Sequence, residues 1–598
     1  MRSIRNSKAA LYGIYAILSF IAAYSAQYIM ASEETAGFYG MHIFSFGVGS
    51  AVFFALTFFL LSRFDLSARK IVFSSIGGIL LSGAFVWGRL ILTEGSITLG
   101  RTGLGGSFIV IIGLSVFTIP LFSELIKLTD TLRDRVKEGE CRDKISVKYF
   151  LTVLLIFFVS YIPFFLRSWP INMFGDASDE IKDYLLHTIS THHSMLHTLM
   201  LGWAYDLGVK LGDPARGMMF FTLFQMLILS GSMAFFMSEV HRRGTATALR
   251  KVLFFIILLN PVNAYFAVTA EKGTIGLAVA LIVITLILRI SDGSARKYEY
   301  IVLVLAAPLA CHFRNNLIYA YLAAGIIFCL LRKGAKKKLM IIVMLAAVFL
   351  LYKGEKKIIM NATDATSPDT YREAFVLPEM CLARTLTLHG PAGDGTMPED
   401  FYDAIAYYIP EYALEYYSPA LSNDFKFHVD ETRLRNDKVT FIKLFIKGFF
   451  KYPGDYIDQF CWLTFGYWNP GPTWVLPTTL TIAYPDTPEE FDDIIVQNLW
   501  PIKGDVLNYI FYGEGKFEIP VLGLFARPFL YIWICYFAVI YGAYKKDKRL
   551  LALAALPFMY LLTVYLGPTC LFRYMHFNIL TMPVLIYGII CGKERSSI

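Results

Sequence analysis

Residues 149–167 read YFLTVLLIFFVSYIPFFLR, a run in which the only charged residue is the last one, Arg167. A run of this length and hydropathy is typical of a helix that crosses a membrane. The whole chain has the same character, since 56% of its 598 residues are hydrophobic, 16% are aromatic and the mean hydropathy is +0.52. The sequence therefore predicts an all-α polytopic membrane protein rather than a soluble multidomain protein.

Similar apolar runs recur along the chain. We expect about fourteen transmembrane helices, with boundaries accurate to a few residues, at 9–30, 41–62, 71–92, 105–124, 149–167, 217–240, 252–269, 273–290, 300–313, 316–331, 339–352, 521–542, 550–567 and 574–591. The apolar stretch 196–211 contains Asp206 and Lys210, and counting it as a span would place Arg242 and Arg243 outside. We therefore interpret it as a re-entrant or interfacial helix.

Lys and Arg in the short loops set the orientation, because positive charge is held on the cytoplasmic side. When the fourteen spans are threaded, that is, laid back and forth across the membrane in chain order, the basic segments fall on one side. Among them are 63–70, 125–148, 241–243, 289–297, 332–338 and 545–549. This predicts a multi-pass protein of the cell membrane with both termini in the cytoplasm. The 168–216 loop and the 353–520 segment are then extracytoplasmic.

The same threading divides the chain into four parts. These are a four-helix membrane extension with a cytoplasmic loop (1–148), a membrane module that carries the external loop 168–216 (149–352), an extracytoplasmic domain (353–520), and a three-helix membrane segment (521–598). The 353–520 part, which we expect to be mixed but mainly α-helical, has more Asp and Glu than Lys and Arg, although the whole chain has a net charge of +8. No soluble region combines a basic patch with aromatic residues, so nucleic acid is not indicated as a partner.

A cluster of ionisable residues follows the 149–167 run directly. Residues 174–180 read FGDASDE and residues 192–198 read HHSMLHT. Such groups beside a bilayer are costly unless they pair with a partner, an ion or a substrate, so they indicate a site. Asp176, with Asp179 and Glu180 on the same side of a predicted helix, can serve as a general base for a sugar hydroxyl. The alternative is that Asp176 caps this helix and Asp179 completes a capping box.

The histidines of this loop have three interpretations. His193 and His197 are four residues apart, a spacing that can bind a divalent metal with Asp176 or Glu180 as an oxygen donor. His192 and His193 can instead orient a phosphate, or a histidine can simply be a satisfied polar group at the interface. The metal therefore stays unassigned, and no other cofactor is indicated.

These motifs resemble the GT-C superfamily of polyprenyl-phosphate-sugar-dependent glycosyltransferases, and in particular a bacterial branch with Gly-Asp followed by His-His-Pro-x-Leu-His-Thr. This chain has Gly175-Asp176 and, at residues 192–198, HHSMLHT, with Ser194 in place of the proline. The resemblance covers residues 149–335 and extends to the rest of the chain only through general architecture. It implies that 149–352 is a GT-C-like module and that residues 168–216 form its catalytic loop.

A polyprenyl-phosphate leaving group is anionic and needs fixed cations at the outer surface. Lys272, Arg314 and Arg573 are candidates, because the threading places all three outside, against the orientation bias. The matching branch has basic residues near Lys272 and Arg314, although Glu271-Lys272 departs from its Lys-Asp order. The alternative is that these side chains only reach toward lipid headgroups.

The external segment 353–520 contains Trp468 and Trp474, whose faces can stack on an acceptor sugar or can anchor the segment at the interface. Residues 441–465, with Lys443, Lys447 and Lys451, are expected to form an amphipathic helix against the headgroups.

These observations predict an inverting glycosyltransferase. It would move a sugar from a polyprenyl-phosphate donor to a cell-surface glycan or lipid acceptor at the outer face. Two alternatives remain: a transporter or flippase of lipid-linked sugars, and a glycan polymerase that uses the same cations without a base such as Asp176. The paired, Gly/Pro-broken helices that mark many transporters are not evident in the sequence.

Overall fold

The structure is a computed structural model of the chain. It describes residues 8–30, 48–65, 67–100, 102–136, 139, 141–173, 176–367, 374–470, 499 and 522–591. The structure is about 79% helical, and the described residues include no strand. The predicted all-α class is confirmed.

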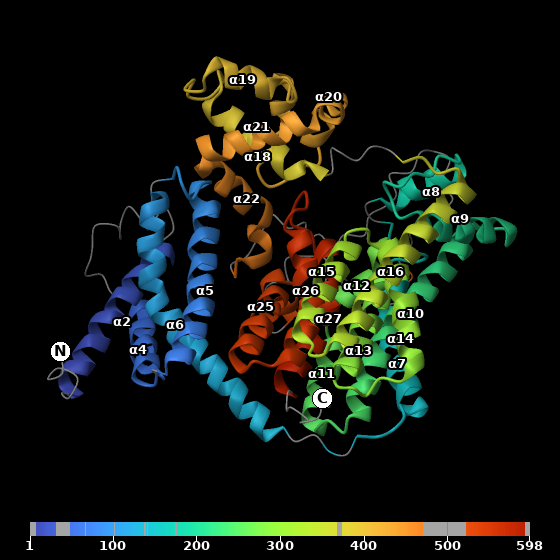
Figure 1. Cartoon of the computed structure of the whole chain (residues 1–598), viewed down its shortest axis with the longest axis horizontal. Coiled ribbons are helices and arrows are strands. Elements are labelled where there is room, and N and C mark those ends of the chain that lie inside the picture. Colours follow the sequence, from blue (N-terminus) through green and yellow to red (C-terminus); the bar gives the residue numbers. More distant parts are fainter. Residues whose placement is uncertain are drawn as a thin grey trace. The chain divides into compact units, whose positions relative to one another are not determined.

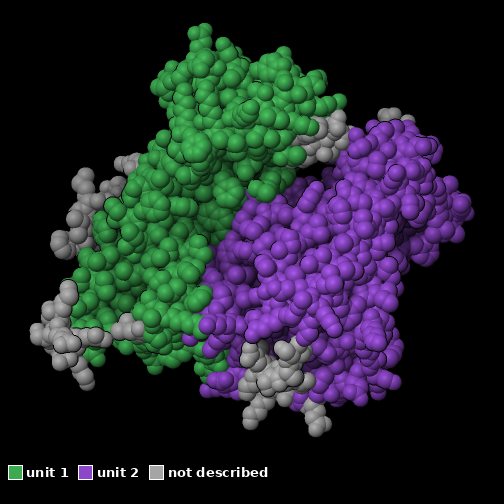
Figure 2. Space-filling model, viewed as in Figure 1, with its two compact units in different colours: residues 1–132, 370–475, 566–570 green, residues 133–369, 476–565, 571–598 purple. Residues whose placement is uncertain are grey.

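The chain packs into two compact units, which Figure 2 colours separately. Unit 1 comprises residues 1–132, 370–475 and 566–570, and unit 2 comprises residues 133–369, 476–565 and 571–598. This grouping follows packing, whereas the four predicted parts follow the order of spans and loops in the sequence. The four-part division stays a prediction.

Unit 1 combines the N-terminal helices with residues 374–470 of the predicted external segment, whereas residues 353–367 of that segment, at the end of α16, belong to unit 2. The α-helices of unit 1, labelled in Figure 1, are α2 (Lys8–Met30), α4 (Val48–Ser62), α5 (Ala68–Glu94), α6 (Gly103–Arg135, which runs into unit 2), α18 (Val376–His389), α19 (Glu399–Ala406), α20 (Glu431–Asn436), α21 (Lys438–Lys451) and α22 (Pro453–Trp468). Two short 3₁₀ helices, η1 (Glu411–Tyr416) and η2 (Phe425–Phe427), lie between α19 and α20 in the chain.

Unit 2 is a helix bundle that contains the 149–335 region. Its helices are α7 (Val147–Arg167), α8 (Ala177–Leu185), α9 (Met195–Lys210), α10 (Pro214–Arg242), α11 (Thr247–Leu258), α12 (Pro261–Val268), α13 (Gly273–Ser291), α14 (Lys297–Phe313), α15 (Leu317–Leu331), α16 (Ala335–Thr363), α24 (Leu522–Phe525), α25 (Pro528–Lys545), α26 (Lys548–Val564) and α27 (Phe572–Ile590).

Six of the described helices are long and apolar enough to cross a membrane, namely α2, α5, α6, α7, α10 and α13. A seventh span results if α11 and α12, bent by 47° at a short break, cross together. The proline at the start of α12 has no N–H group to continue the preceding helix, which accounts for the break. These helices indicate a multi-pass membrane protein. Each of the fourteen predicted spans overlaps a described helix, but the number fourteen stays a prediction.

The stretch 196–211, interpreted above as re-entrant or interfacial, forms α9, which is not among the candidate spans. Ser194 begins this helix by accepting a hydrogen bond from the backbone N–H of His197. The α9 helix turns back at Gly212 into α10, which begins at Pro214. The loop between α7 and α10 is therefore occupied by the α8–α9 helix pair.

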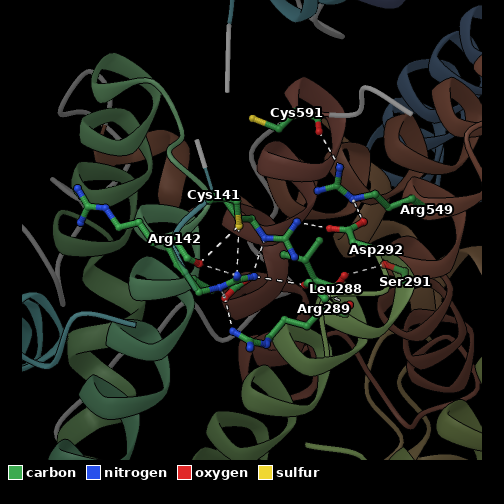
Figure 3. A network of polar contacts seen from close by, with 12 residues as sticks. Cys141, Arg142, Leu288, Arg289, Ser291, Asp292, Arg549 and Cys591 are labelled. Carbon is green, nitrogen blue, oxygen red and sulfur yellow. Dashed lines mark hydrogen bonds and ion pairs between the residues drawn. The ribbon is translucent and has the colours of Figure 1, made fainter. Parts of the chain in front are cut away.

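At the end of α10, a network of buried ion pairs joins several helices of unit 2 (Figure 3). Glu239 is fully buried and pairs with Arg242 at 2.7 Å, with Arg243 at 2.6 Å and with Arg289 at 2.6 Å. Asp292 pairs with Arg243 and, at 2.9 Å, with Arg549. Three of the basic segments that the sequence assigns to one side of the membrane thus lie together at one end of unit 2.

Candidate functional site

Two loops that are distant in sequence are joined beside Asp176. The backbone N–H of Asn172 donates to the carbonyl of Val268 at 2.9 Å, and the N–H of Ala270 donates to the carbonyl of Asn172 at 2.9 Å. These bonds form a short parallel bridge. The bridge aligns the segment that leads to Asp176 with the turn that carries Lys272.

A buried glutamine fixes the same turn from α10. The side-chain amide of Gln225 donates to the carbonyls of Phe266, Ala267 and Thr269 at 2.9, 3.1 and 2.8 Å. Carbonyls at the end of a helix lack partners within that helix, so this amide satisfies the end of α12. Gln225 therefore helps to position Lys272, which stands just before α13.

Three positively charged or titratable side chains surround Asp176. The Nζ atom of Lys272 lies 2.6 Å from Asp176 Oδ2, and a guanidinium nitrogen of Arg573 lies 3.7 Å from Oδ1. His193 Nδ1 lies 3.8 Å from Oδ2. The three partners come from the turn before α13, the start of α27 and the loop before α9. Tertiary packing thus assembles three of the residues that the sequence proposed independently.

The charge state of Asp176 follows from these contacts. Burial alone would raise the pKa of the Asp176 carboxyl, but Lys272, Arg573 and His193 together hold it well below its usual range. The carboxylate therefore stays ionised at neutral pH. Although Asp176 stands at the N-cap position of α8, its side chain makes no capping hydrogen bond. The capping interpretation of this side chain is wrong.

His193 lies close to both Asp176 and Lys272. Its Nδ1 is 3.4 Å from the Nζ of Lys272, and because an ammonium group only donates, Nδ1 is the acceptor. Burial and the charge of Lys272 lower the pKa of His193, so the imidazole is neutral at pH 7. His192 is exposed, and its ring centroid lies 4.6 Å from that of His193.

Arg314 belongs to the same cluster through a second carboxylate. Its guanidinium group lies 3.4 Å from Glu271 Oε1 and donates to the backbone carbonyl of Arg573 at 3.1 Å and to the Tyr560 hydroxyl at 3.3 Å. Glu271 is buried and accepts the backbone N–H of Gly273 at 2.7 Å. The sequence interpretation did not use Glu271 as a site residue, although its place directly before Lys272 was the available signal.

An aromatic ring connects the two arginines. The guanidinium carbons of Arg314 and Arg573 both lie 5.1 Å from the centroid of the Tyr574 ring. The Tyr574 hydroxyl also accepts a hydrogen bond from Arg573 at 3.2 Å. A ring face stabilises a nearby cation, so Tyr574 helps to hold two like charges close together. The sequence interpretation missed this residue.

The cluster carries an excess of positive charge. Three cations, Lys272, Arg314 and Arg573, face two carboxylates, Asp176 and Glu271. Buried and partly buried cations with more than one donor each are suited to an anion that has several acceptor oxygens. The arrangement can therefore bind a phosphate and keep an ionised carboxylate next to it.

The other two carboxylate candidates have different surroundings. Glu180 is only 1% exposed, and its Oε2 lies 2.5 Å from Nδ1 of the buried His197. Thr198 donates to the same oxygen at 3.3 Å. This contact joins α8 to α9. Asp179 is exposed on α8, and among the described residues no hydrogen bond or ion pair links its side chain to the cluster.

The histidine and carboxylate positions do not fit a metal site. Within the described ranges, no group of three or more His, Cys, Asp or Glu side chains is placed to hold a metal ion. His193 contacts Lys272, whereas Nδ1 of His197 is bound to Glu180 in the interior. The two histidines therefore do not converge on one point, and we assign no step to a metal.

The acceptor candidates lie in unit 1. Trp468, at the end of α22, is partly buried, packs among hydrophobic residues and donates from its indole to Thr464 at 3.1 Å. Trp474 lies outside the described residues. Phe174 and Gly175, which belong to the motif quoted for the resemblance, are outside them as well.

Comparison of the chain with models of protein families, with curated proteins and with solved structures finds no match. The assignment of a function therefore depends on the residues and their geometry.

Proposed function

We propose that this chain is a membrane glycosyltransferase of the GT-C type. It takes a sugar from a polyprenyl-phosphate donor at the outer face of the cell membrane and adds it to a cell-surface glycan or lipid. The observation that carries this proposal is the approach of Lys272 and Arg573 to the two oxygens of Asp176, at 2.6 and 3.7 Å. An ionised carboxylate thus stands beside cations suited to a phosphate.

The reaction assigns a separate role to each charge. The acceptor hydroxyl gives its proton to Asp176 as its oxygen attacks the anomeric carbon of the donor. The bond from that carbon to the phosphate oxygen breaks, and its electron pair leaves with the lipid phosphate. Lys272 and Arg573 stabilise the negative charge that develops on the leaving phosphate.

Arg314 and His193 support these two cations. Arg314 donates to the backbone carbonyl of Arg573 and pairs with Glu271, next to Lys272. It adds positive charge and holds the residues at the starts of α13 and α27. The neutral imidazole of His193 accepts from Lys272 and so orients the ammonium group.

The test is sugar transfer by the purified protein in lipid nanodiscs, measured on a panel of synthetic polyprenyl-phosphate sugars. We expect Asp176→Asn to lower kcat by about 10²–10⁴-fold, the usual contribution of a general base. Asp179→Asn changes an exposed carboxylate of the same helix and should retain most of the activity. Equal loss in both variants would contradict the role of Asp176.

A second outcome would replace the proposal. If the wild-type protein turns over no donor but moves lipid-linked sugars between the leaflets, the chain is a transporter. If Asp176→Asn keeps full activity on a lipid-pyrophosphate substrate, the polymerase alternative holds.

A further inference from the structure

The Asp176 carboxylate occupies the cations that the donor phosphate needs. Its Oδ2 lies 2.6 Å from Lys272 and its Oδ1 lies 3.7 Å from Arg573. A phosphate presents its oxygens to ammonium and guanidinium donors in the same way as a carboxylate does. The two anions would therefore use the same two cations.

The same contacts weaken Asp176 as a base. A carboxylate that is paired with two cations binds a proton poorly, and its pKa is well below its usual range. Proton transfer from a sugar hydroxyl is more favourable when the pKa of the base is closer to the working pH. The ion pair of Asp176 with the two cations is therefore suited to the enzyme without donor, and not to the step of proton transfer.

We propose that the donor phosphate displaces the Asp176 carboxylate from Lys272 and Arg573, so that donor binding itself frees Asp176 to act as the base. This inference rests on the proposed function. It makes the ion pair a latch that keeps the base inactive until the phosphate is in place.

The surroundings of the three groups favour movement of the carboxylate rather than of the cations. Asp176 is 30% exposed and its side chain caps no helix, so it can rotate without breaking a helix end. Lys272 is the N-cap residue of α13, directly before Gly273. The Arg573 backbone is bound by Arg314, and its guanidinium group lies over Tyr574. The cations are held from several sides.

The direct test measures binding of polyprenyl phosphate without a sugar, which cannot be turned over, to the full-length protein in nanodiscs. If the carboxylate competes with phosphate, Asp176→Asn should bind about tenfold more tightly than wild type, a change of about 1.4 kcal/mol. Lys272→Gln should bind at least roughly tenfold more weakly. Lys182→Gln, an exposed lysine on α8, serves as the matched control and should bind like wild type.

The outcomes separate this inference from the proposed function. Equal or weaker binding by Asp176→Asn, with wild-type binding intact, overturns the competition but leaves the transferase proposal standing. Absence of binding by the folded wild-type protein overturns both. Thermal unfolding of each variant shows whether it is folded.

Steady-state kinetics give a second readout. The pH dependence of kcat/KM reports the free enzyme and that of kcat reports the complex with bound donor. Lys272, Arg573 and His193 face Asp176 in the free enzyme. When the phosphate takes over Lys272 and Arg573, Asp176 loses its two contacts with positive charge and its pKa should rise. The acid limb of kcat should then lie at a higher pH than the acid limb of kcat/KM. Coincident acid limbs would contradict the latch.

A different observation in unit 1 supports a second inference. Helix α21 exposes a stripe of apolar side chains, of which Val439 is 59% and Phe450 is 78% exposed. The stripe comprises Val439, Ile442, Ile446, Phe449 and Phe450, which share one face of the helix. Its opposite face, with Phe441, Leu444 and Gly448, is buried in the unit. Exposed apolar surface of this kind marks an interaction site.

Lysines border this stripe. Lys443, Lys447 and Lys451 lie at successive turns of α21, next to the apolar face. Of these, Lys447 has a long contact of 3.9 Å to the exposed Asp400. Such a pair contributes little because water screens it, so the lysines can still attract an anionic surface. Apolar residues flanked by lysines are the pattern of helices that lie in a membrane interface.

The chain that follows α21 contacts the residues that follow a candidate membrane span. Gly454, in the first turn of α22, comes so close to Thr98 that a Cβ atom would lie 2.8 Å from the Thr98 hydroxyl oxygen. Asp458 accepts hydrogen bonds from the N–H of Ile97 at 2.8 Å and from the hydroxyl of Thr98 at 2.9 Å. These residues directly follow α5, a candidate span. The lysine-rich end of α21 is therefore next to the expected membrane surface.

We infer that α21 binds the surface of an anionic bilayer, with its apolar stripe toward the acyl chains and its lysines toward the headgroups. The sequence predicted one amphipathic helix over 441–465. The structure divides this segment at Tyr452, and most of α22 is buried within the unit. The interfacial part is therefore α21 alone.

The test places the full-length protein in nanodiscs that contain phosphatidylglycerol with a diazirine in its acyl chain. After photolysis, mass spectrometry should find several-fold more lipid on residues 438–451 than on η2, where Phe427 is 60% exposed. The triple variant Lys443→Gln, Lys447→Gln, Lys451→Gln should lose most of this difference. Labelling no greater than at Phe427, or equal labelling with diazirine phosphatidylcholine, would overturn the assignment to an anionic surface.

Discussion

Asp176 and Glu180 are four residues apart, and both are candidate bases in the sequence, with Asp176 the preferred one. Asp176 keeps 30% of its surface exposed and contacts two cations, whereas Glu180 is 1% exposed against His197. A carboxylate that meets a substrate needs a route to solvent, so of these two residues Asp176 is the one whose exposure suits the proposed base. The packing of α9 makes this difference, because it covers one position of α8 and leaves the other open.

The pH dependence of activity should depend on Lys272. In the wild type, Asp176 has a lowered pKa, so it stays ionised until the pH falls far below neutral, and we expect the acid limb of kcat/KM at low pH. Lys272→Gln removes the nearest positive charge while burial still favours the neutral acid. We expect its acid limb to move to higher pH, measured as kcat/KM against pH.

The corresponding control is Lys182→Gln, which removes an exposed lysine of α8 and should leave the profile where it is. An unchanged acid limb in Lys272→Gln would show that Asp176 does not control the profile.

At the scale of elements, the α8–α9 pair depends on a buried acid–imidazole contact. Glu180 Oε2 lies 2.5 Å from His197 Nδ1, with both side chains buried. Removing one partner of such a pair leaves the other buried without its hydrogen bond. Glu180→Ala should therefore cost about 1–3 kcal/mol of stability.

Thermal unfolding in a fixed detergent measures this loss. Lys182→Ala, an exposed change on the same helix, should shift the unfolding temperature little. An unfolding temperature close to wild type in Glu180→Ala would mean that α8 is held mainly by its apolar contacts.

A second element-scale prediction concerns the turn between α12 and α13. Gln225 donates to three carbonyls at the end of α12. Gln225→Leu keeps a similar volume but leaves these carbonyls without their donor, at a cost of about 1–3 kcal/mol for an unsatisfied group. Because Lys272 follows this turn, we expect KM for the donor to rise more than kcat falls. Steady-state kinetics measure the split, and a loss of stability with an unchanged KM would contradict a positioning role.

At the scale of the whole molecule, the sequence predicts which loops share a side of the membrane. Leu186, exposed in the 168–216 loop, should be outside, and Lys297, exposed at the start of α14, should be inside. In a background without the native cysteines, Leu186→Cys should react with a membrane-impermeant maleimide on intact cells. Lys297→Cys should react only after permeabilisation. The reverse pattern would overturn the predicted orientation.

The sequence by itself determined the helical membrane class, because apolar runs of spanning length have few other stable folds in lipid. It also identified Asp176, Lys272, Arg314 and Arg573 as candidates, because a charged residue next to an apolar run can be recognised from the sequence alone. Their common signal is local, so each could be found without knowledge of its neighbours.

Only the tertiary structure decided which of these charges meet. The bonds between Asn172 and the turn after α12, and the packing of α27, bring Lys272 and Arg573 to Asp176 across long separations in the chain. Hydrophobic periodicity carries no information on such pairing, because it gives the buried face of a helix and not its neighbour. For the same reason the sequence missed Glu271 and Tyr574, whose roles arise from contacts with Arg314.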